Sequence, residues 1–342
     1  MALSIHQQSI DVYGKLKMWV DPLQSMLEID AMTSWQYAFV RTMVLGFGLF
    51  IRVIPFQSPQ ALRTLDTISR TFEPIKVLPR GVTSKSDLIA EVPCEWIEPD
   101  NADTQRVMLY LHGGGFMAGW NPLHRYIVAR LAKHAALTAV AVDYRTTPDH
   151  PYPAPLDDCF AVYTLLLDQG YDPQHIAIAG DSAGGNLVFA LMHRLKQVAL
   201  PLPACGVGLS PMVDLDIKRE ALPAIADPML SEGVLLATAD HYCGAHDRRS
   251  PFISPVYGNM QNFPPIMLCI AEYELLRPSI KQFAQSAAAA GVSVTTIEGK
   301  GLWHVWPGFA PYLPEAEQTL IKVAQFIKVA TDATEQAIIR RS

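Results

Sequence analysis

The sequence predicts an α/β fold in which a mostly parallel central sheet carries helices on both faces. From about residue 91 onward, short β-branched runs alternate with segments whose apolar residues recur at helical spacing. Half of the residues are hydrophobic and 18% are charged, which is typical of a globular domain with a sizeable core. Alternation of strand and helix favours parallel pairing, and functional groups then gather at the carboxyl ends of the strands.

The elements of this fold follow one another in a regular order. Strands are predicted at residues 92–98, 106–111, 138–144, 175–180, 206–210, 265–271 and 293–298. Helices are predicted at 123–135, 156–168, 186–198, 278–290 and 314–330. Residues 1–85 have helical patterns without a strand signal, and residues 214–250 form a charged, irregular insertion. We interpret 1–85 as an N-terminal helical cap region, 86–342 as the main α/β domain and 214–250 as a second cap segment.

Composition excludes several classes of partner and compartment. The net charge is −6 and no basic stripe is present, so the sequence predicts no nucleic-acid partner. The N-terminal residues lack the apolar stretch of a secretion signal. The five cysteines are scattered singly, as expected of small core residues in a reducing compartment. They are Cys94, Cys159, Cys205, Cys243 and Cys269. We therefore expect a cytoplasmic protein.

The most apolar segment of the chain covers residues 35–56. Arg41 and Arg52 bracket an uncharged run of ten residues, 42–51. A membrane-spanning helix needs about twenty apolar residues, so this run is too short to span. The segment is predicted to be a buried or substrate-covering helix. A helix that lies in a membrane interface is the alternative, which the sequence does not favour.

The motif GDSAGGN, residues 180–186, places Ser182 between a strand and a helix. The strand-like run HIAIAG precedes the serine, small residues surround it, and apolar residues at helical spacing follow it. This context is typical of a nucleophile elbow, in which a tight turn exposes a serine hydroxyl at the end of a strand. An ordinary turn with a helix-capping serine is the alternative interpretation.

A second glycine-rich motif, HGGGF, follows the strand predicted at 106–111. Consecutive glycines at 113–115 let backbone N–H groups approach a bound substrate closely. A phosphate-binding loop is a competing interpretation, but the G-K-[S/T] pattern of such loops is missing.

A serine nucleophile needs a base, and the base needs an acid that orients it. His304 follows the last predicted strand, which suits the chain order serine, acid, histidine. The acid is then expected between 182 and 304 at a strand end, where Glu272 and Glu274 both follow the strand at 265–271. Spacing alone does not choose between these two carboxylates.

Together, HGGGF, VDYRTTPDHPYPAPLDD, GDSAGGN, LSP and H-x-W resemble the bacterial hormone-sensitive-lipase family of carboxylesterases, within the α/β-hydrolase superfamily. The resemblance runs from about residue 106 to 310 and implies an α/β-hydrolase fold with a helical cap. The family commonly has D-P-L or D-x-L where this chain has EYELLR, so Glu274 stands in place of the aspartate. The implied roles are Ser182 as nucleophile, His304 as base, Glu274 as acid, Gly114, Gly115 and Ala183 as oxyanion donors, and His112 as a structural anchor of the loop.

The resemblance therefore implies a serine carboxylic-ester hydrolase that forms an acyl-enzyme. We expect a small-molecule ester substrate, with small to medium acyl esters or lactones favoured, and neither a metal nor another cofactor. Three alternatives stay open: an amidase or formamidase with the same residues, a lipase that acts at a membrane surface, and a non-catalytic binding protein on the same fold. The sequence makes no prediction of the oligomeric state.

Overall fold

The computed structural model describes residues 25–30, 35–73, 78–310 and 312–332. Its strands are β1 (Ser25–Asp30), β2 (Val82–Ile89), β3 (Val92–Pro99), β4 (Asp103–Leu111), β5 (Leu137–Val142), β6 (Ile176–Asp181), β7 (Cys205–Leu209), β8 (Ile266–Tyr273) and β9 (Val294–Trp303). They form one sheet in the order β1-β9-β8-β7-β6-β4-β5-β3-β2. Every pair of neighbouring strands from β1, at one edge, as far as β5 is parallel. The last two pairs, β5–β3 and β3–β2, are antiparallel.

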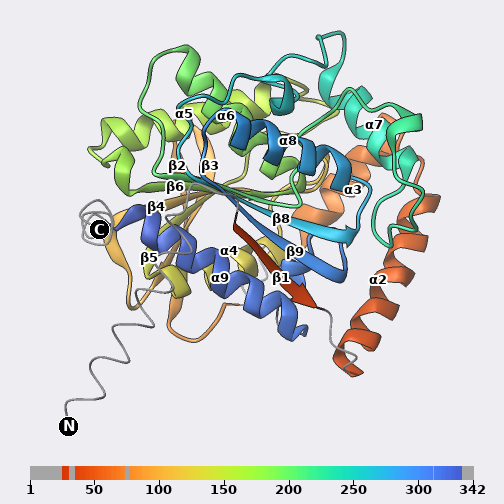
Figure 1. Cartoon of the computed structure of the whole chain (residues 1–342), viewed down its shortest axis with the longest axis horizontal. Helices are drawn as coiled ribbons and strands as arrows, with labels where there is room; N and C mark the ends of the chain where they lie inside the picture. The colour runs from red at the N-terminus through yellow and green to blue at the C-terminus, as the bar shows by residue number, and fades with distance from the viewer. Residues whose placement is uncertain (1–24, 31–34, 74–77, 311, 333–342) are drawn as a thin grey trace.

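Helices cover both faces of the sheet (Figure 1). They are α2 (Trp35–Val53), α3 (Pro59–Thr71), α4 (Pro122–Ala135), α5 (Ala154–Asp168), α6 (Ser182–Gln197), α7 (Glu232–Cys243), α8 (Arg277–Ala289) and α9 (Pro314–Thr331). Helices α5, α6 and α8 bury side chains in the core on one face of the sheet. Helices α4 and α9 do so on the other face. The α/β fold with helices on both faces is therefore confirmed.

The central strands explain why the sequence predicts this fold well. In β4, the six residues from 106 to 111 are all buried, and β6 is buried along its whole length. A central parallel strand has helices on both faces, so it consists of an almost continuous apolar run instead of an alternating one. Each predicted strand is present, with its bounds shifted by up to five residues.

Two strands lie in the region for which the sequence shows no strand signal. Strand β1 pairs in parallel with β9 at one edge of the sheet. Strand β2 pairs with β3 at the opposite edge, as a hairpin. The expected boundary at residue 85 falls inside β2. Two strands of the sheet therefore contain residues from the region interpreted as a helical cap.

Helix α2 covers most of the segment 35–56, for which the sequence predicts a buried or substrate-covering helix. Its buried residues are Val40, Val44 and Gly48, which form a single stripe at a spacing of four. Eight large apolar side chains of the helix are exposed: Trp35, Phe39, Met43, Leu45, Phe47, Leu49, Phe50 and Val53. Burial is wrong for these side chains, which leaves the substrate-covering alternative for the helix.

Candidate active site

Ser182 lies at the sharp turn between β6 and α6. The strand ends at Asp181, the helix begins at Ser182, and the φ of Ser182 is 50°, in the left-handed region. A Cβ on Gly180 would come within 2.6 Å of the Gly184 carbonyl oxygen, and a Cβ on Gly184 would overlap the carbonyl of Leu111. These glycines are required for the close packing that holds the turn, and the turn presents a hydroxyl at the carboxyl end of β6.

Ser182, His304 and Glu274 form one hydrogen-bonded line. His304 Nε2 lies 2.9 Å from Ser182 Oγ, and His304 Nδ1 lies 2.9 Å from Glu274 Oε2. His304 is 3% exposed and Glu274 is fully buried. When Nδ1 carries a proton, its N–H donates a hydrogen bond to Glu274, and Nε2 is free to accept one from the serine hydroxyl. The structure thus brings together three residues that are far apart in the sequence.

The two glutamates at the end of β8 have different partners. Glu274 Oε1 accepts a 2.7 Å hydrogen bond from the N–H of Ala271, which fixes the carboxylate that faces His304. Glu272 Oε2 accepts a 2.6 Å hydrogen bond from the N–H of Gly301 in β9. Glu272 is therefore bound to the neighbouring strand and does not contact the histidine.

The glycine loop leaves backbone N–H groups available. The φ angles of Gly114 and Gly115 are 110° and 63°, which favour glycine. The Gly114 carbonyl accepts hydrogen bonds from Met117 and Ala118, which closes a turn. Within the described residues, the N–H groups of Gly114 and Gly115 donate to no acceptor. Ala183 is in the first turn of α6, where N–H groups have no acceptor within the helix.

A buried carboxylate, that of Asp181, joins the glycine loop to the turn that bears Ser182. Its Oδ1 accepts hydrogen bonds from the Tyr110 hydroxyl, at 2.8 Å, and from the Gly113 N–H, at 3.0 Å. Asp181 is 3% exposed. Burial raises the pKa of Asp181 above its ordinary value, although these two hydrogen bonds oppose the shift. The residue before Ser182 therefore also sets where the glycine loop begins.

Two buried histidines lie beneath the same loop. The His112 ring stacks on Tyr144 with a centroid distance of 4.1 Å, and its Nδ1 lies 2.7 Å from the Gly113 carbonyl. Burial lowers the pKa of both His112 and His124 to about 4. His124 is therefore neutral near pH 7, and its 3.6 Å approach to Asp181 is not an ion pair. These are the contacts of residues that hold the loop in place.

Helix α7 packs on the outer side of the loop. The Tyr242 ring stacks on Phe116 with a centroid distance of 3.7 Å and an interplanar angle of 7°. A Cβ on Gly115 would lie 3.1 Å from Thr238 Oγ1. His241 Nε2 lies 3.0 Å from the carbonyl oxygen of Phe56, which connects α7 to the segment between α2 and α3. Two segments that are distant in the sequence therefore meet over the glycine loop.

Sequence reasoning missed Asp181 and His124. Asp181 carries a signal that could have been used, because it is a carboxylate directly after a buried apolar strand and directly before the candidate nucleophile. His124 carries no such signal, since it lies in the first turns of α4 among other polar residues. In the ranges that the structure describes, no group of three or more histidine, cysteine or acidic side chains could hold a metal ion.

Comparisons with known proteins agree with this geometry. The profile of a family described as alpha/beta hydrolase fold matches residues 108–308. An acetyl-hydrolase of Streptomyces hygroscopicus is 33% identical over 245 residues, 71% of this chain and 82% of that protein. An esterase of Acinetobacter venetianus is 34% identical over 303 residues, 86% of this chain and 96% of that protein. The solved structure of an esterase from the bacterial hormone-sensitive lipase family has a TM-score of 0.79 at 32% identity, covering 88% of this chain and 100% of that one.

The fold and the site define a carboxylic-ester hydrolase, as the sequence predicts. The chain belongs to the alpha/beta hydrolase fold family and, within it, to the bacterial hormone-sensitive lipase esterases. The resemblance on which the sequence analysis relies is thereby confirmed. None of the described helices has the length and apolar character needed to cross a membrane.

Proposed function

We propose that Ser182 attacks the carbonyl carbon of a carboxylic ester while His304 Nε2 takes its proton. The observation that carries the proposal is the continuous line from Glu274 through His304 to Ser182, with 2.9 Å at each contact. A serine hydroxyl is a poor nucleophile without a base in hydrogen-bond contact. Glu274 keeps the proton on Nδ1 and stabilises the imidazolium that forms.

The negative charge that develops on the carbonyl oxygen needs donors. The N–H groups of Gly114, Gly115 and Ala183 are the candidates, because within the described residues they donate to no acceptor, and Ala183 directly follows the serine. The tetrahedral intermediate then expels the alcohol, which takes the proton from His304 Nε2. Water attacks the acyl-enzyme with the same base, and the acid product leaves Ser182 free.

The cap is the second part of the proposal. An apolar cluster joins the two segments interpreted as cap to the glycine loop, and its buried members are Phe56, Leu62, Met117, Val234 and Ala237. We assign 35–73 and 214–250 to a cap over the site, and the remaining described segments, β1 and β2 included, to the catalytic domain. An apolar cap suits small to medium acyl esters or lactones, and one similar protein is an acetyl-hydrolase.

A series of p-nitrophenyl esters from C2 to C12, measured beside the matching anilides, tests this function. We expect the highest kcat/KM among the short and medium esters and little turnover of anilides. A Ser182→Ala variant is the matched control for background hydrolysis. Faster cleavage of the anilides would favour the amidase alternative, and equal rates in wild type and Ser182→Ala would refute the serine mechanism.

The exposed apolar surface of α2 favours a second candidate, a lipase that acts at a membrane interface. Phe47 is 50% exposed and Phe50 is 60% exposed, and the helix contains no acidic residue. Helices that lie in a membrane interface carry such aromatic faces. Co-sedimentation with phosphatidylcholine vesicles tests it: Phe47→Gln with Phe50→Gln should reduce binding, whereas Ile321→Gln on α9, also exposed, should not. Absence of vesicle binding by the wild type would refute this candidate.

A further inference from the structure

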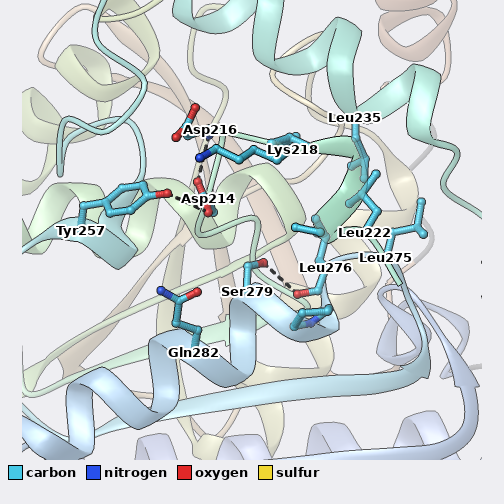
Figure 2. A pocket seen from close by; sticks show the side chains of 13 residues that line it. Asp214, Asp216, Lys218, Leu222, Leu235, Tyr257, Leu275, Leu276, Ser279 and Gln282 are labelled. Atoms are coloured by element: carbon cyan, nitrogen blue, oxygen red, sulfur yellow. Dashed lines mark hydrogen bonds between the residues drawn. The ribbon is translucent and has the colours of Figure 1, made fainter. Parts of the chain in front are cut away.

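A cavity of about 240 Å³ lies between the chain segment 214–222 and the first half of α8 (Figure 2). Helix α7 and Tyr257 complete its wall. Its lining contains none of Ser182, Glu274 and His304, so it is separate from the residues proposed to perform the chemistry.

The two sides of the cavity differ in character. Leucines at 222, 235, 275 and 276 gather on one side, and Asp214 and Tyr257 face them from the other (Figure 2). The apolar side offers contact to a hydrocarbon group, and the polar side offers a carboxylate. Ligand sites commonly combine a mostly apolar lining with a few polar groups that fix orientation.

Asp214 is the polar group best placed to hold a ligand. Its Oδ1 accepts a 2.9 Å hydrogen bond from the N–H of Asp216, and its Oδ2 accepts one of 3.1 Å from the Tyr257 hydroxyl. A carboxylate offers about four acceptor positions, so it can accept further hydrogen bonds. Burial raises the pKa of Asp214, although the charge of Arg249 opposes the shift.

The charged residues that line the cavity favour a cation. Two carboxylates, Asp214 and Asp216, and one ammonium, Lys218, line it, which leaves an excess of one negative charge. Arg249 stacks on Tyr257 with 4.6 Å between its guanidinium carbon and the ring centroid, and it is not part of the lining. An ammonium group donates hydrogen bonds and carries the complementary charge.

We propose that this cavity binds a small amphiphile with a protonated primary amine and a short alkyl chain. The ammonium group donates to Asp214 and the chain packs against the four leucines. A volume of 240 Å³ corresponds to about eight water volumes. A primary ammonium with about five carbons, or six non-hydrogen atoms, therefore fits within it. This is a second binding site, beyond the proposed ester hydrolysis.

Isothermal titration calorimetry with pentylammonium chloride tests the proposal, on the full-length enzyme with Ser182 blocked by an organophosphate. We expect a Kd on the order of 1 mM, as for other ligands of this size. Pentanol should bind at least about tenfold more weakly, and pentanoate should not bind, because each lacks the cationic donor. Equal binding of all three probes would overturn the proposal. Binding that disappears when Ser182 is blocked would do the same, since the amine would then occupy the substrate site.

Two variants locate the site. Asp214→Asn keeps the shape of the side chain and should weaken pentylammonium binding by about tenfold. Ala221→Phe places a ring in the cavity and should abolish binding, which keeps the test decisive if the aspartate variant does not fold. Asp168→Asn, an exposed carboxylate on α5, is the matched control and should bind as the wild type does. Unchanged affinity in both Asp214→Asn and Ala221→Phe would overturn the proposal.

Discussion

Replacing Glu274 by Gln should reduce kcat by about 10² to 10⁴, because the wrong histidine tautomer is then favoured. Glu274 uses one oxygen for the Ala271 N–H, at 2.7 Å, and the other for His304 Nδ1, at 2.9 Å. A glutamine has one acceptor oxygen, so satisfying Ala271 turns its amide N–H₂ toward His304. Nδ1 must then accept, the proton moves to Nε2, and Nε2 can no longer take the proton of Ser182.

The size of the loss follows from two contributions. The site loses the carboxylate charge that stabilises the imidazolium, and the reactive tautomer becomes the minor one. A thousandfold loss corresponds to about 4 kcal/mol of barrier. Glu274→Asp keeps the charge but shortens the reach, so we expect a fall of about tenfold, or about 1.4 kcal/mol.

Glu272→Gln is the matched control, two residues earlier in the chain and within β8. Its carboxylate binds the Gly301 N–H, and a glutamine oxygen can keep that bond. We expect less than about a tenfold change in kcat. The assay is steady-state hydrolysis of p-nitrophenyl acetate near pH 7.5, with Tm measured for each variant. If Glu272→Gln is the crippling change and Glu274→Gln keeps most of the activity, the assignment of the acid is refuted.

Three further predictions use the same preparation. Ser182→Ala should lower kcat by about 10⁴ or more with little change in Tm. Mass spectrometry of the wild type should locate an organophosphate adduct on Ser182. An adduct on another serine would contradict the assignment. Asp181→Ala removes the acceptor of the Gly113 N–H and should cut kcat by about 10² to 10³, with a smaller effect on KM; a normal kcat would show that the loop does not need it. Burial lowers the pKa of three histidines to about 4 from 6.5. Below pH 6.5 the unfolded chain therefore binds protons that the folded chain does not, and stability falls as the pH is lowered toward 4. His193→Gln should reduce this slope by up to about 1.4 kcal/mol per pH unit in urea titrations, and an unchanged slope would contradict the cause.

The sequence predicts the central strands because each of them can be identified from its own residues, without knowledge of its pairing partners. An uninterrupted apolar run such as 106–111 suits a strand covered on both faces, whatever its neighbours are. Helix α6 begins four residues earlier than the apolar spacing indicates, at Ser182 instead of 186. The reason is the elbow, whose small residues carry no hydrophobic pattern but continue the helix to the end of the strand.

The edge strands could not be predicted in this way. Strands β2 and β3 are joined at Ala90 and Glu91, which both have positive φ, 52° and 65°. Asparagine and glycine are the usual residues in such a turn, and neither occurs there, so the hairpin signal is missing. Strand β1 is six residues long and depends on pairing with β9, some 270 residues away in the sequence.

The candidate triad was predictable as a set of residues, but its geometry was not. Chain order and motif context indicate Ser182 and His304, and only the resemblance separates Glu274 from Glu272. The register of β8 against β9 shifts between Ala271 and Tyr273, so alternation along the strand does not tell which carboxylate faces the histidine.

Asp181 connects the strained turn at Ser182 to the glycine loop. A positive φ at a non-glycine residue costs on the order of 1–3 kcal/mol and persists only when its surroundings enforce it. Two features hold Ser182 in this conformation. The glycines at 180 and 184 pack without room for a Cβ. The carboxylate of Asp181 accepts hydrogen bonds from the Tyr110 hydroxyl and the Gly113 N–H. Because the carboxylate is covalently linked to the nucleophile and hydrogen-bonded to the loop, a displacement of one displaces the other. Asp181 therefore helps to set the distance between the attacking oxygen and the proposed oxyanion donors, and a variant at 181 should affect kcat before it affects KM.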